Sequence, residues 1–190
     1  MKILILILIG IVILVWLFVL YTALIKKKNT LLEACSSIDV QLKKRYDLIP
    51  NILTIANKFM EHERELMNKI TELRAQAMRI PADITQTTRK IDLDKQITTL
   101  IGQLQVSAEN YPQLKSDQTM LQAMKTYNAT EERIAAARRY YNAAAKDLNN
   151  AVEIFPSSIV ASMLGIKKAE FIKAEEHERQ KIDANNMLKN

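Results

Sequence analysis

The sequence predicts an all-α protein in which an N-terminal transmembrane helix is followed by an antiparallel, up-and-down bundle of about four long helices. Three observations lead to this prediction. The 190 residues include only three glycines and four prolines, too few for the many tight turns of sandwiches, barrels and βαβ repeats. Of the first 25 residues, 22 are apolar. In the rest of the chain, apolar residues recur at alternating steps of four and three, the period of a packed helix.

Residues 1–25 form the predicted membrane-spanning segment. The 23 residues from Ile3 to Ile25 carry no charge. At about 1.5 Å per residue they give a helix of roughly 35 Å, enough to cross a hydrocarbon core of about 30 Å. A cleaved signal peptide is the alternative, but its apolar region is usually about 7–15 residues long and ends at small residues. Here the run ends at Leu24-Ile25-Lys26, so we favour a retained anchor.

Basic residues at the end of the span indicate its orientation. Lys26, Lys27 and Lys28 follow the span directly, whereas Lys2 precedes it, and basic residues near a span stay mostly on the cytoplasmic side. We therefore expect the N-terminus outside and the bulk of the chain in the cytoplasm. The same three lysines are candidates for contact with anionic lipid headgroups, worth about 1 kcal/mol each.

The helical body is expected over residues 26–172, followed by a charged C-terminal tail at 173–190. The apolar register runs through Pro50, so this proline should kink or restart a helix that continues from the membrane span. Three later prolines should end helices, and serine or aspartate just after two of them could cap the next helix. The predicted helices are 51–80, 82–111 and 113–155, and the predicted caps are Ser116-Asp117 and Ser157-Ser158.

Charged residues interrupt two of the apolar stripes. Eleven of thirteen stripe positions between Ile38 and Ile80 are apolar, and the other two are one base and one acid. The stripe from Met120 to Phe155 is also interrupted by one acid and one base. We expect these charges to pair between helices, because a lone buried charge is costly. The alternative is that their long side chains extend outward to water. This predicted polar seam consists of Arg45, Glu63, Glu131 and Arg138.

Several kinds of chemistry are disfavoured by the residue content. One cysteine and two histidines exclude an internal disulfide framework and a Cys/His zinc site, and we expect Cys35 to be a small buried hydrophobe. His62-Glu63 lacks the second histidine of a metalloprotease helix, and the glycines form no phosphate loop. No GxSxG nucleophile motif occurs. The excess positive charge lies near the span, so we expect the basic residues to meet lipid phosphate rather than nucleic acid. We expect no catalytic residue, metal, cofactor or small-molecule substrate.

Four stretches form long, ordered motifs: SIDVQLKKRYDLIPNI at 37–52, AENYPQLK at 108–115, EERIAAARRYYN at 131–142 and FPSSIVA at 155–161. Together they resemble the LemA family of bacterial membrane proteins, over residues 1–171. The resemblance implies a single N-terminal span in the bacterial inner membrane that carries a long-helix bundle, without an established enzymatic activity. The family motif residues past the span form a polar collar that binds a partner or closes the bundle: Asp39, Gln41, Arg45, Tyr46, Asp47, Pro50 and Asn51.

These observations favour a membrane-anchored scaffold or adaptor that binds an unidentified partner protein or forms a homo-oligomer. Self-association would use a second apolar face of small residues, which could equally pack inside the bundle. Those residues are Ala135, Ala136, Ala143 and Ala144. One alternative is a lipid-organising protein that uses Lys26, Lys27 and Lys28 with Lys167-Lys168. Another is a hydrolase or protease helper with a site in the 39–51 stretch, which would need a concave site with convergent polar groups.

Overall fold

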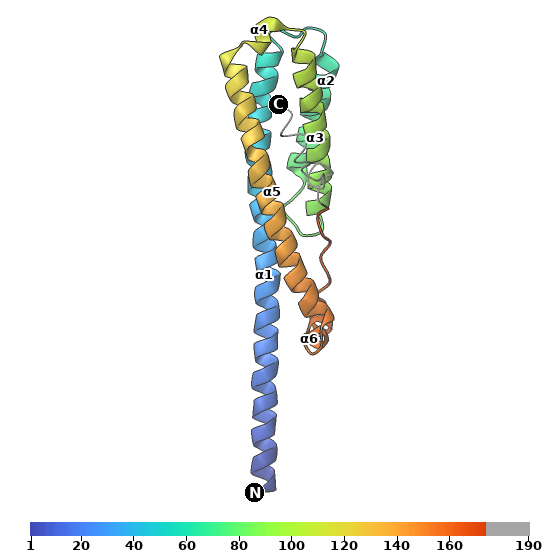
Figure 1. The fold of residues 1–190 in the computed structure, drawn as a ribbon. Helices are drawn as coiled ribbons and strands as arrows, with labels where there is room; N and C mark the ends of the chain where they lie inside the picture. The colour runs from blue at the N-terminus through green and yellow to red at the C-terminus, as the bar shows by residue number, and fades with distance from the viewer. Residues whose placement is uncertain (174–190) are drawn as a thin grey trace, which may run out of the picture.

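The computed structural model describes residues 1–173. Over these residues the chain forms six α-helices and no strand, which confirms the predicted all-α class. The helices are α1 (Lys2–Ala56), α2 (Arg64–Arg79), α3 (Thr87–Ala108), α4 (Pro112–Lys115), α5 (Gln118–Glu153) and α6 (Ser157–Met163). The four long helices α1, α2, α3 and α5 make up the bundle (Figure 1). Apart from Lys173, the predicted charged tail lies outside the described residues.

α1 is one continuous helix of 55 residues, about 80 Å long at 1.5 Å per residue. Side chains from Ile3 to Val19 are exposed on every side, and the first buried residue is Leu24. The exposed stretch is long and apolar enough to cross a membrane. The helix continues without a break past residue 25, so the candidate span and the bundle share one rod.

The bundle is built up and down around the upper half of α1 (Figure 1). α2 descends beside α1, α3 rises, α4 lies at the top, and α5 descends along α1. The antiparallel α1–α5 pair is the most extensive contact between helices, followed by the α2–α3 hairpin. Because that hairpin is shorter than α5, the lower part of the α1–α5 pair extends beyond it toward the candidate span (Figure 1).

Pro50 lies inside α1 rather than at a helix end. A proline removes the hydrogen bond to the carbonyl four residues earlier, which here is that of Tyr46. Arg74 of α2 supplies a replacement, since its Nε donates to Tyr46 O at 2.7 Å. The Nη2 atom of Arg74 also lies 3.9 Å from Asp47 Oδ1. Arg74 therefore joins α2 to α1 at the carbonyl of Tyr46, the acceptor that Pro50 leaves without its helical donor.

The prediction of one helix over 51–80 is wrong. α1 ends at Ala56, the chain reverses direction over 57–63, and α2 begins at Arg64. The run from Glu61 to Glu65 contains no apolar residue, so a helix there would have nothing to bury. The apolar register resumes in phase in α2, which is why the sequence reads as a single helix.

The two predicted helix caps have different outcomes. Asp117 caps α5 as predicted, since its Oδ1 accepts a hydrogen bond from Met120 N at 2.8 Å. Ser157-Ser158 was the wrong assignment for α6, because the N-cap position is Pro156 and makes no side-chain cap bond. The Ser157 hydroxyl instead donates to Ile154 O at 3.0 Å.

Residues 166–173 follow α6 and run back along the bundle without regular secondary structure (Figure 1). Two asparagines of α5 each bind both main-chain groups of one residue in this segment. Asn149 donates to Ala169 O at 2.9 Å and accepts from Ala169 N at 2.8 Å. Asn142 donates to Ile172 O at 2.8 Å and accepts from Ile172 N at 2.9 Å. Ala169 and Ile172 are buried, so the segment extends the core.

The core follows the predicted apolar stripes over most of their length. Cys35 is 2% exposed, in agreement with its prediction as a buried hydrophobe. Phe155 departs from the pattern, since it lies past the end of α5 and is 74% exposed. The stripe residues that are buried in α1, α3 and α5 include Ile38, Leu42, Ile49, Ile52, Ala56, Ile97, Leu104, Met120, Met124, Tyr127, Ile134, Tyr141, Ala145 and Leu148.

Candidate functional site

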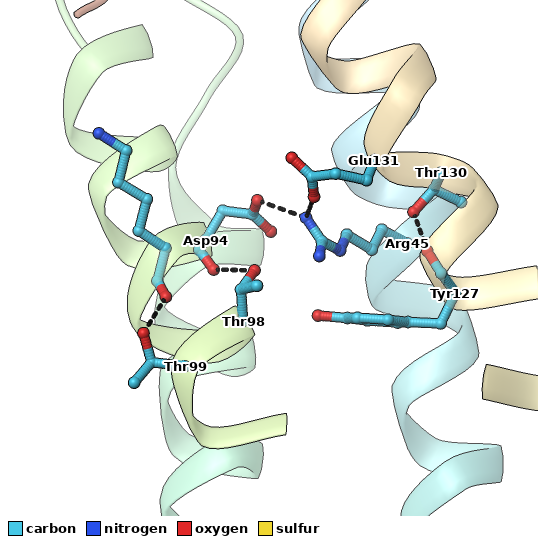
Figure 2. A network of polar contacts seen from close by, with 8 residues as sticks. Arg45, Asp94, Thr98, Thr99, Tyr127, Thr130 and Glu131 are labelled. Carbon is cyan, nitrogen blue, oxygen red and sulfur yellow. Dashed lines mark hydrogen bonds and ion pairs between the residues drawn. The ribbon is translucent and has the colours of Figure 1, made fainter. Parts of the chain in front are cut away.

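A buried arginine lies at the centre of the bundle. Arg45 of α1 forms ion pairs with Asp94 of α3 and Glu131 of α5 (Figure 2). Its Nη1 lies 3.0 Å from Asp94 Oδ2 and 2.7 Å from Glu131 Oε2. The side chain of Arg45 is 3% exposed, that of Asp94 8% and that of Glu131 35%. The guanidinium also lies over the ring of Tyr127, 4.4 Å from its centroid. We call these four residues the Arg45 cluster.

Burial and charge act in opposite directions on Arg45. Burial by itself lowers the pKa of the guanidinium, but the charge of Asp94, followed by smaller contributions from Tyr127 and Glu131, outweighs it, so the pKa is raised overall. Burial also raises the pKa of the hydroxyls of Tyr46 and Tyr127. At neutral pH the cluster therefore holds a cationic arginine next to the neutral Tyr127, and the neighbouring Tyr46 is neutral as well.

A second ion pair joins α1 to α3. Asp39 of α1 pairs with Lys90 of α3, and Lys90 Nζ also donates to Ile80 O, just after α2, at 3.1 Å. α1 and α3 run in the same direction. Along that direction the acid Asp39 precedes the base Arg45 on α1, whereas the base Lys90 precedes the acid Asp94 on α3. Sliding one helix past the other would bring Asp39 toward Asp94 or Arg45 toward Lys90. The two pairs thus favour a single register.

This arrangement is suited to fixing helices relative to one another. Arg45 joins α1 to both α3 and α5, and Lys90 connects α1 to the end of α2. Paired buried charges specify geometry at some cost in stability. In the part of the chain that the structure describes, no group of three His, Cys, Asp or Glu side chains could hold a metal ion.

Comparison with known proteins places the chain in a family. The sequence matches the family model described as the LemA family over residues 34–185. The chain belongs to the LemA family. Among its relatives is Protein LemA of Metamycoplasma hominis, which is 27% identical over 164 residues, covering 86% of this chain and 74% of that protein. Two magnetosome proteins of Paramagnetospirillum magneticum, MamQ 1 and MamQ 2, are each 35% identical over 71 residues. That stretch covers 37% of this chain and 26% of each MamQ protein.

The collar of the LemA motif at 37–52 does not form one surface. Tyr46 is fully buried, whereas Asp39 and Gln41 are half-buried. Asp47 and Asn51 are exposed. The helical twist of α1 therefore divides the collar, with one part closing the bundle and another part facing outward.

The predicted polar seam is brought together only in part. Arg45 and Glu131 meet in an ion pair between α1 and α5. Arg138 instead binds the segment after α6, since its Nη2 donates to Lys173 O at 2.7 Å. Glu63 is half-buried at the N-cap position of α2, because the chain reverses there and takes this residue off the stripe of α1.

Sequence reasoning missed Lys90 and Asp94, which supply the α3 side of both ion pairs. The apolar stripe that the sequence indicates for this helix, Leu93, Ile97, Leu100 and Leu104, passes beside them. A usable signal exists, because Lys90 and Asp94 share the spacing of four and three with Ile97 and Ile101, and all four are buried. The identity of their partners on α1 depends on how distant helices pack, and helical periodicity does not reveal it.

A groove of about 410 Å³ lies between α1 and α5. Its floor includes the half-buried side chains of Leu48, Ile55 and Ala123. Asn51, an exposed collar residue, lies at its edge. All the lining residues come from these two helices, and the remaining ones are Thr54, Thr119, Gln122 and Thr126.

The lysines proposed to meet lipid headgroups lie next to the candidate span. Lys26 and Lys28 are exposed and Lys27 is half-buried. Lys167 and Lys168 are exposed after α6, and Lys168 pairs with Glu153.

The four alanines suggested for self-association differ in their exposure to solvent. Ala144 is buried and Ala135 is half-buried, whereas Ala136 and Ala143 are exposed.

Proposed function

We propose that this LemA-family protein is a membrane-anchored, non-catalytic scaffold that holds a partner protein in a fixed position relative to the membrane. One observation carries the proposal. α1 runs unbroken from the candidate span to the top of the bundle, and Arg45 within it contacts both α3 and α5. A body built on the anchor's own helix moves with the anchor, and rigid support is what holds a bound partner in a defined geometry.

The proposed location is the bacterial inner membrane, with the body in the cytoplasm. Lys26, Lys27 and Lys28 directly after the span support this orientation. A cysteine introduced at the exposed residue Gln96 of α3 reports it in intact cells. We expect a membrane-impermeant thiol reagent to label Gln96→Cys only after lysis, and labelling of intact cells would contradict the cytoplasmic placement.

The proposed docking site is the groove between α1 and α5, and its proposed occupant is a helix of the partner protein. Two neighbouring helices leave a groove into which a third amphipathic helix can pack. The groove has an apolar floor of Leu48, Ile55 and Ala123, with hydroxyl and amide groups around it. The exposed collar residue Asn51 would then contact the partner, while the buried collar residues hold α1 in place.

Site-specific photo-crosslinking in cells tests this function. A photoreactive phenylalanine analogue at Thr126, in the groove, should give a covalent adduct with a partner. The same analogue at Gln96, exposed on α3, is the matched control and should give none. Adding Ala123→Arg should remove the Thr126 adduct, because the longer charged side chain fills the groove.

The outcomes are distinguishable. An adduct that requires a free groove supports the scaffold, and its mass separates a different protein from a second copy of this chain. Equal adducts from Thr126 and Gln96, or a Thr126 adduct that persists with Ala123→Arg, would contradict the proposal. Absence of any adduct from Thr126 would also count against it.

A further inference from the structure

Large apolar side chains are exposed together at the corner between α5 and α6. Phe155 is 74% exposed, Ile159 55% and Met163 83%. Ile159 and Met163 are four residues apart in α6 and therefore lie on one face, while Ala161 on the other side is fully buried. We call this corner the apolar tip, and its exposed residues are Ile154, Phe155, Ile159, Met163 and Leu164.

The apolar tip lies at the end of the body nearest the candidate span. Figure 1 shows α6 at the lower end of α5, beside α1, on the side where the bare N-terminal part of α1 begins. α6 contacts α1, and the first buried residue of α1 is Leu24. The uncharged run of α1 ends at Ile25. The body therefore reaches down to the level at which α1 would leave the hydrocarbon core.

Charge near the apolar tip fits the same position. Lys167 and Lys168 follow α6 within a few residues and are exposed. Lys26 and Lys28 are exposed just past the end of the uncharged run. Apolar side chains that enter the boundary between headgroups and acyl chains, flanked by lysines, are typical of segments that lie in a membrane interface. Large apolar side chains exposed next to one another on a protein surface also indicate a contact.

We propose that the apolar tip is a second membrane contact, which inserts Phe155, Ile159 and Met163 into the interface of the leaflet from which α1 emerges. The occupant of this surface is the lipid bilayer, because the tip lies at the level where the span ends. The inference rests on the proposed anchoring of α1 in a membrane. Its consequence is attachment at two points, so that the tilt of α1 and of the body relative to the membrane plane is restrained.

Depth-dependent fluorescence quenching tests the contact in the full-length protein. Single cysteines labelled with the fluorophore NBD are placed at Met163 and Phe155 in the apolar tip, and the protein is reconstituted in phosphatidylcholine–phosphatidylglycerol vesicles. Val12→Cys reports the span. Val106→Cys is the matched control, because Val106 is an aliphatic residue 69% exposed near the upper end of α3. Cys35 is buried and stays in place, and protein without an added cysteine gives the background labelling.

We expect lipids with a nitroxide near the headgroup to quench most of the fluorescence from the labels at Met163 and Phe155. Lipids with a nitroxide deep in the acyl chain should quench the Val12 label more strongly, and neither lipid should quench the Val106 label. A quenched Val12 label with tip labels no more quenched than Val106 overturns the contact and leaves the anchor standing. An unquenched Val12 label overturns both. Tip labels with blue-shifted emission but no quenching by lipid would show that another protein, such as a second copy of this chain, covers the apolar tip. That result would also overturn the proposal.

Discussion

Replacement of Arg45 by methionine should destabilise the bundle far more than loss of an exposed ion pair. The variant leaves the carboxylate of Asp94, with a side chain only 8% exposed, without its arginine partner. Removal of one partner from a buried pair costs about 3–5 kcal/mol. At roughly 2–4 °C per kcal/mol for a chain of this size, Tm should fall by about 6–20 °C. Glu131 adds little to this cost because its side chain, 35% exposed, is reached by water.

The double variant Arg45→Met with Asp94→Leu separates the buried charge from the packing. If the cost comes from the buried carboxylate that has lost its arginine, removing both charges should recover most of the lost stability, since apolar replacement of a buried pair is often neutral. Far-UV circular dichroism of the protein in detergent, followed against temperature and urea, measures each variant. Lys69→Met is the matched control, because Lys69 pairs with Glu72 on the exposed surface of α2, and it should change stability by less than about 0.5 kcal/mol. A loss from Arg45→Met no greater than that of Lys69→Met, or no recovery in the double variant, would refute the reasoning.

Three further perturbations have outcomes set by single contacts. Asn149→Ala removes both hydrogen bonds to the main chain of buried Ala169, so it should cost about 1–3 kcal/mol of stability. It should also speed amide hydrogen exchange over residues 166–173. Asn150→Ala, at an exposed neighbour, should change neither stability nor exchange. Pro50→Ala restores the N–H that donates to Tyr46 O, so the bond from Arg74 to this oxygen is then less needed. Arg74→Met should therefore cost less stability in the Pro50→Ala background than in the wild-type protein. Equal losses in urea melts would contradict the role of Arg74 as the replacement donor. Burial raises the pKa of Tyr141 to about 12, so the stability from its protonated form is complete below pH 10, its ordinary pKa, and is lost as the pH rises through 12. The part of the tyrosinate absorbance that comes from the three buried tyrosines should therefore rise together with the loss of helical signal above about pH 10. Ionisation of all six tyrosines with the helices intact would contradict the burial of Tyr46, Tyr127 and Tyr141.

The helical class and the candidate anchor could be predicted from local sequence, because both depend on periodicity and on an uncharged run. The reversal at 57–63 escaped the same reasoning, since Ala56 and Ile70 are buried on either side of it and keep the apolar register in phase. The available signal was the run at 61–65, which contains four charged residues, one histidine and no apolar residue.

The partners of the candidate site could be predicted only in part. An acid and a base among apolar stripe positions indicated that Arg45 and Glu131 are held between helices, and they form an ion pair. Asp94 contributes from α3, and its meeting with Arg45 depends on the packing of helices 49 residues apart in sequence. The helical pattern gives no signal for the roles of Asn142 and Asn149, because their partners lie in a segment without helical periodicity. Contacts of this kind need the tertiary structure.

The central claim is that one rigid helix carries both the membrane anchor and the body. Spin labels at exposed Val15, in the span, and at exposed Lys44, in the body, test it most directly in lipid nanodiscs. Val15 and Lys44 are 29 residue steps apart, and at about 1.5 Å per step they predict a single narrow distance distribution near 44 Å. A broad distribution, or a mean well below that distance, would show a hinge after the span and would contradict the account.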